Sequence, residues 1–186
     1  MTAEPVPTSP PGSWWQRTVF QEAGRERLGM GERIGSVIGI VFILFIFAVL
    51  IDIQMSGVGF FTDEFGPLEQ VALYGSLLYG IFPGLIRAIT ASRNLGRLAD
   101  IIGSVIFIIA ASYLLVVYPF DVTKLVNYLT GPLSGVFFWL TNELARFIMQ
   151  FAIVVSVFSA IYNTIMYLAV REELRGRRTS ASWSGP

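Results

Sequence analysis

The chain contains no cysteine and no histidine among its 186 residues. The absence of cysteine excludes disulfides, thiol catalysis, zinc held by thiolates and cysteine-ligated iron–sulfur clusters within this chain. The absence of histidine removes the commonest metal and haem ligand, and the side chain that most often carries protons near neutral pH. We therefore expect no cofactor, and in particular no metal or redox centre, to be held by this chain alone.

Charged residues are also scarce, because they make up 14% of the chain whereas soluble domains carry about a quarter. Hydrophobic residues make up 54%, and the mean hydropathy is +0.64. This composition predicts an all-α integral membrane protein with one membrane domain. The sequence has no G-x-S-x-G motif, no Walker loop and no pair of metal ligands, so we expect no enzyme activity. It also shows no nucleic-acid-binding module.

Four apolar segments are long enough to cross a bilayer, which requires about 20 residues. They are residues 34–53, 69–89, 101–118 and 147–170, within a membrane domain of residues 34–170. Residues 122–146 are interrupted by Gly131-Pro132 and by a polar cluster at Asn142–Arg146. We interpret them as a helical segment that lies along the outer membrane surface before the fourth span. The sequence thus predicts a bundle of four transmembrane helices.

The two ends of the chain differ from this apolar region. Residues 1–12 are polar and proline-rich, which is typical of a disordered tail, and we expect no cleaved signal peptide. Residues 13–30 predict an amphipathic helix in the cytoplasmic membrane interface, beginning with a capping box at Ser13 and Gln16. A helix that packs its apolar face on other protein is the alternative. Residues 171–186 form an arginine-rich tail.

The basic residues predict the orientation of the four spans. Eleven of the 13 lysines and arginines fall on one side: Arg17, Arg25, Arg27, Arg33, Arg87, Arg93, Arg97, Arg171, Arg175, Arg177 and Arg178. Because basic residues are enriched in cytoplasmic loops, we expect both termini to be cytoplasmic and the protein to lie in the plasma membrane. A fifth span at residues 122–141 would place the arginine-rich tail outside. With four spans, the outer side is acidic.

Small residues recur at spacings that let helix backbones approach each other closely. The candidate helix-packing residues are Gly35 and Gly39 in the first span, Ala72, Ser76, Gly80 and Gly84 in the second, and Ala152, Ser156, Ser159 and Asn163 in the fourth. We expect Pro83 to bend the second span just after its small face. The candidate interfacial anchors are aromatic: Trp14, Trp15, Phe137, Phe138 and Trp139.

The ionisable residues narrow the choice of function. Charged side chains lie only near the ends of the predicted spans, which argues against an ion-coupled transporter or proton pump. The sequence favours a non-catalytic accessory, scaffolding or assembly subunit of a larger membrane complex. Its expected partners are the lipid bilayer and other membrane subunits or copies of itself. The alternative is a homo-oligomeric channel or passive small-solute transporter, supported by Pro83, the polar seam at Asn163 and the acidic outer side.

Overall fold

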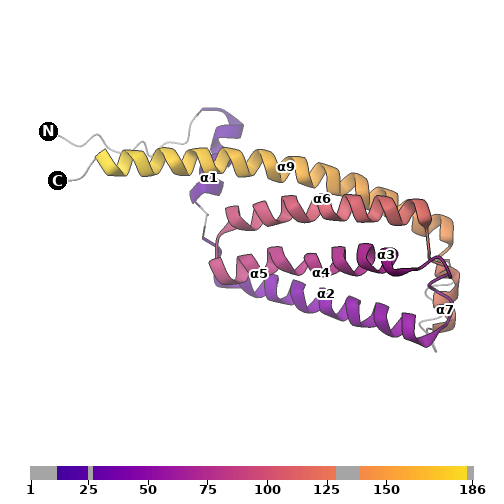
Figure 1. The fold of residues 1–186 in the computed structure, drawn as a ribbon. Helices are drawn as coiled ribbons and strands as arrows, with labels where there is room; N and C mark the ends of the chain where they lie inside the picture. Colours follow the sequence, from indigo (N-terminus) through magenta and orange to yellow (C-terminus); the bar gives the residue numbers. More distant parts are fainter. Residues whose placement is uncertain (1–11, 25–26, 129–138, 184–186) are drawn as a thin grey trace.

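The computed structural model describes residues 12–24, 27–128 and 139–183, and the elements in these ranges are helices (Figure 1). The elements are α1 (Trp14–Gly24), α2 (Met30–Ser56), α3 (Pro67–Gln70), the π-helical turn η1 (Val71–Gly75), α4 (Ser76–Tyr79), α5 (Ile81–Thr90), α6 (Arg93–Val117), the 3-10 turn η2 (Val122–Lys124), α7 (Leu125–Tyr128) and α9 (Asn142–Trp183). Four helical segments are long and apolar enough to cross a membrane, namely Met30–Ser56, Pro67–Thr90, Arg93–Val117 and Asn142–Gly176. The predicted all-helical class with four candidate spans is therefore confirmed.

Helix α2 is longer than the predicted first span of residues 34–53, and local signals explain both of its ends. The backbone N–H of Gly29 donates to the Glu32 carboxylate at 3.2 Å, which caps the first turn. Gly57 ends the helix with φ +64°, a left-handed conformation that glycine adopts without a side-chain clash. Helix α2 therefore begins about one turn before the predicted apolar span.

The second span, from α3 to α5, is continuous but locally irregular. It contains the π-helical turn at Val71–Gly75 and an interruption at Gly80, whose N–H is shared between the carbonyls of Ser76 and Leu77 at 3.3 and 3.1 Å. Pro83 has no N–H to donate four residues back, which weakens this part of the hydrogen-bond ladder. This irregularity begins before Pro83, and the bend expected at Pro83 stays a prediction.

Helix α6 begins at Arg93 rather than near residue 101. The Ser92 hydroxyl caps it by accepting a hydrogen bond from the Leu95 N–H at 3.2 Å. The predicted third span began only after the charged side chains of these first turns. Those side chains are paired in the folded chain, so their charges do not end the helix.

Helix α9 begins at Asn142 rather than at residue 147, and it continues through most of the predicted arginine-rich tail. Thr141 caps its start by accepting from the Leu144 N–H at 3.2 Å. The predicted surface segment at residues 122–146 is consequently divided. Its beginning forms η2 and α7, its last residues form the first turn of α9, and residues 129–138 lie outside the described part of the chain.

The long helices lie side by side in the order α9, α6, α5 and α2 (Figure 1). Helix α6 packs against α9 on one side and α5 on the other, while α2 packs on α4 and α5. In the described ranges, α2 and α9 thus occupy the two edges of the array and do not pack along each other. The predicted bundle is therefore open between these two helices.

Helix α1 packs on α9 near one end of the array (Figure 1). Its Val19 and Ala23 are buried against Met166 and Val170, which are themselves fully buried. The capping box predicted at its start is confirmed, because the Gln16 N–H donates to the Ser13 hydroxyl at 3.2 Å and the reverse bond measures 3.3 Å. The apolar face of α1 therefore contacts protein, which corresponds to the alternative interpretation of residues 13–30.

The opposite end of the array is held by an aromatic cluster. Phe65, Tyr118 and Phe120 are buried there, and the ring centroids of Phe61 and Phe65 lie 4.2 Å apart. The Arg146 guanidinium lies 4.1 Å above the centre of the Tyr118 ring, which joins the start of α9 to the end of α6. These contacts fix the loops that connect α2 to α3 and α6 to η2.

The loop after α6 also contains a carboxylate with several donors. Thr123 donates to Asp121 through its hydroxyl at 2.6 Å and through its backbone N–H at 3.2 Å, and the Asn142 amide donates at 3.2 Å. These hydrogen bonds, with the Thr123 hydroxyl contributing most, hold the pKa of Asp121 below its ordinary value. Asn142 in turn accepts from the Val122 N–H at 2.8 Å. The loop is thereby tied to the first turn of α9.

Candidate functional site

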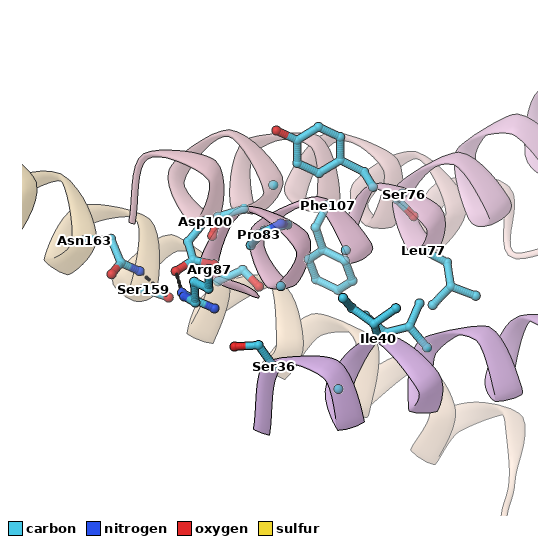
Figure 2. Close-up of a pocket in the computed structure, with 18 of the residues that line it drawn as sticks. Ser36, Ile40, Ser76, Leu77, Pro83, Arg87, Asp100, Phe107, Ser159 and Asn163 are labelled. Atoms are coloured by element: carbon cyan, nitrogen blue, oxygen red, sulfur yellow. Dashed lines mark hydrogen bonds and ion pairs between the residues drawn. The ribbon is translucent and has the colours of Figure 1, made fainter. Parts of the chain in front are cut away.

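A cavity of about 940 Å³ lies between α2, α4, α5, α6 and α9 and opens on one side of the array (Figure 2). We call it the lateral groove. Eight of the ten small residues selected from the sequence line it: Gly35, Gly39, Ser76, Gly80, Gly84, Ser156, Ser159 and Asn163. Of the other two, Ala72 packs beside the aromatic cluster and Ala152 lines a second cavity of about 320 Å³.

The glycines of the lateral groove fall into two groups. A Cβ added at Gly84 would lie 3.0 Å from Ile40 Cγ1, and one at Gly80 would lie 3.3 Å from Ile43 Cδ1, so both glycines let α4 and α5 approach α2. A Cβ added at Gly35 or Gly39 would meet nothing within 4 Å. The first pair therefore serves helix packing inside the chain, whereas the second pair faces the open space of the groove.

An ion pair lies at one end of the lateral groove. Nη2 of Arg87, on α5, donates to Oδ2 of Asp100, on α6, and the two side chains are 32% and 24% exposed. Gly96 makes room for this pair, because a Cβ there would lie 2.7 Å from Arg87 Cγ and Nε. From the sequence both charges were expected near span ends, and no pairing between them was predicted. Opposite charges on either side of the short turn at Ala91 and Ser92 were the available signal.

The two ends of the lateral groove differ in polarity. Figure 2 shows the ion pair together with Ser36, Ser159 and Asn163 at one end. Towards the other end it shows Ile40, Leu77 and Phe107, with the Ser76 hydroxyl beside them. The Asn163 amide donates to the Ser159 hydroxyl at 3.3 Å, which orients both side chains of α9. The groove is consequently amphipathic along its length.

Further ion pairs connect three helices at the same end of the array. Arg93 of α6 pairs with Glu32 of α2 and lies 3.6 Å from Glu22 of α1, and Arg97 pairs with Glu22 at 2.5 Å. Arg33 of α2 donates to the backbone carbonyl of Ala88 at 2.9 and 2.6 Å. The beginning of α6 therefore remains helical although it is charged, because each of its arginines contacts a carboxylate from a distant part of the sequence.

The predicted interfacial anchors lie at separate places. Trp14 on α1 is 77% exposed, Trp15 beside it is 38% exposed, and Trp139 just before α9 is 53% exposed. Phe137 and Phe138 fall outside the described residues. The tryptophans are thus available for contact with a membrane or a partner, and none of them lines the lateral groove.

The fold and the groove together define an all-helical protein with four candidate membrane spans and an amphipathic cavity on its side. Within the described ranges, no group of three or more acidic side chains is placed to hold a metal ion. No protein-family model, curated protein or solved structure matches this chain. A proposal of function therefore has to begin from the geometry of the chain itself.

Proposed function

We propose that this chain is a non-catalytic accessory, scaffolding or assembly subunit of a larger complex in the plasma membrane. The length of α9 is the observation that carries the proposal. At about 1.5 Å per residue, its 42 residues extend over about 63 Å, roughly twice the hydrocarbon thickness of a bilayer. The last part of the helix must then project from the membrane. We call this part, from Arg171 to Trp183, the arm, and it is able to contact a partner.

The contacts of α1 support this arm. Val19 and Ala23 cover Met166 and Val170, so the helix is packed where it leaves the apolar region. Beyond that point α9 exposes the charged side chains of Arg171, Glu172 and Arg175. A braced, charged helix provides a defined surface for another subunit, and such a role needs no reactive side chain. The expected partners are other membrane subunits or further copies of the chain.

The orientation of the chain is part of this proposal. We place the arm and α1 in the cytoplasm because the positively charged residues gather at that end, and we place the loop between α2 and α3 outside. The chain has no cysteine, so Glu172→Cys and Glu64→Cys each introduce one thiol at an exposed position. A membrane-impermeant maleimide on intact cells is expected to label position 64 only. Labelling of position 172 without labelling of position 64 would reverse the orientation.

Site-specific photo-crosslinking tests the proposed role. A photoreactive amino acid at Glu172, on the arm, is expected to yield a discrete protein adduct when the full-length chain is expressed at its natural level. The matched control is Phe158 on the same helix, which is 69% exposed within the apolar span and is expected to yield no such adduct. The absence of a discrete adduct at Glu172, or a chain that migrates alone after mild solubilisation, would contradict the subunit role.

A homo-oligomeric channel or passive small-solute transporter is the second candidate, and the serines and Asn163 of the lateral groove favour it. The purified chain in liposomes distinguishes the two. A downhill solute leak that Asn163→Leu abolishes would support the transporter, whereas liposomes that remain tight agree with the subunit.

A further inference from the structure

The dimensions of the lateral groove limit what it is able to hold. Along α2 it extends from Glu32 to Leu50, a distance of about 27 Å at the helical rise. Its volume of about 940 Å³ over this length leaves room for an extended hydrocarbon chain.

With α2 centred on a bilayer, the ion pair at the polar end of the groove lies near the headgroups. Arg87 stands three residues before the end of α5, about 4.5 Å along the helix, and Ser36 stands six residues after the start of α2, about 9 Å along it. The hydrocarbon core is about 30 Å thick and α2 is about 40 Å long, so roughly 5 Å at each end of α2 extends into the headgroup region. The ion pair therefore lies close to the boundary between headgroups and hydrocarbon.

The guanidinium of Arg87 provides donors for an anion at this boundary, and the two carboxylates that also line this end, Asp100 and Glu32, are paired with Arg87 and Arg93. The guanidinium of Arg87 carries five N–H donors in a planar fork, and its bond to Asp100 employs only part of that capacity. Figure 2 shows Arg87 between Asp100 and Ser36 at the polar end of the groove. Charge-assisted hydrogen bonds from arginine to phosphate are strong and frequently bidentate. The amide of Asn163 and the hydroxyl of Ser36 add neutral polar groups to the same end.

From this arrangement we propose that the lateral groove binds one phospholipid molecule. Its phosphate contacts Arg87, and an acyl chain lies along Ile40, Leu77 and Phe107. The glycines at positions 35 and 39 leave the space that the chain occupies, since nothing lies within 4 Å of a Cβ added at either. This inference depends on the membrane location of the chain and not on its role as a subunit.

Native mass spectrometry of the purified full-length chain in phospholipid nanodiscs tests the site. The wild-type chain is expected to retain one phosphatidylethanolamine molecule after the nanodisc is removed. Diacylglycerol with the same acyl chains lacks the phosphate and is expected to occupy the site about tenfold less. This corresponds to a difference in binding free energy of about 1.4 kcal/mol. Equal retention of the two lipids would overturn the role of Arg87, and displacement of the lipid by inorganic phosphate would show a site for free phosphate instead.

Two variants test the two ends of the groove. Gly39→Leu fills the apolar part of the groove and is expected to lower retention of the phospholipid at least tenfold. Gly75 also has open space around it but lies outside the groove, so Gly75→Leu is expected to retain the phospholipid. The double variant Arg87→Leu/Asp100→Leu removes the headgroup contact without leaving an unpaired charge, and is expected to lose the preference for phosphate. Unchanged retention in Gly39→Leu, in a chain whose thermal unfolding is also unchanged, would refute the proposal.

Discussion

Gly84→Leu is expected to destabilise the packing of α5 on α2 by about 1–3 kcal/mol, the usual cost of forcing extra atoms into a well-packed contact. A Cβ at this position would lie 3.0 Å from Ile40 Cγ1 and 3.3 Å from the backbone carbonyl oxygen of Ser36. The isoleucine side chain is able to rotate, but the carbonyl belongs to the α2 backbone and moves only with the helix. The two helices must therefore separate to admit a leucine.

The free energy of unfolding of the reconstituted chain measures this effect. Gly75→Leu is the matched control, because it introduces the same side chain in the same span, outside the groove, where nothing lies within 4 Å. The control is expected to unfold like the wild-type chain, and Gly84→Leu to unfold more readily. If the two variants unfolded alike, α2 and α5 would not approach as closely as the structure shows.

Asp100→Leu is expected to be the more damaging of the single substitutions considered, because it leaves the Arg87 guanidinium without its partner. Breaking a buried pair by removing one member costs about 3–5 kcal/mol. The loss of stability should lie at the lower end of that range, since the Arg87 and Asp100 side chains are 32% and 24% exposed. Replacing both members by leucine removes the unpaired charge and is expected to recover most of the lost stability.

A double-mutant cycle on unfolding free energies checks this expectation. The wild-type chain, Asp100→Leu, Arg87→Leu and the double variant together isolate the coupling between the two side chains. The pairing predicts that the double variant is more stable than the sum of the two single losses implies. Strictly additive losses would mean that the two charges act independently, and the ion pair would then have no structural role.

The sequence alone was sufficient to predict the all-helical class and the number of long apolar helices. Apolar runs of about 20 residues are a local property, and a helix satisfies its own backbone hydrogen bonds wherever such a run is placed. The capping box at Ser13 and Gln16 was predictable for the same reason, because both partners lie within one turn. These features depend on neighbouring residues and need no knowledge of the rest of the fold.

The ends of the helices were less predictable because distant residues determine them. The first turns of α6 carry arginines, which by composition indicate a loop at the end of a span. In the folded chain Arg93 and Arg97 are paired with Glu22 and Glu32, more than sixty residues earlier in the sequence. Such pairs offset the charge of the helix start, and no local pattern reveals them.

The tertiary structure alone decided what the small residues do. Gly39 and Gly84 are the same residue type, and each stands four residues after another small residue, so spacing predicts helix packing for both. The structure places Gly84 against α2 and leaves Gly39 facing the lateral groove. The physical reason is that a missing side chain creates either a close contact or an empty space, depending on which backbone lies opposite. Only the arrangement of α2, α5, α6 and α9 supplies that information.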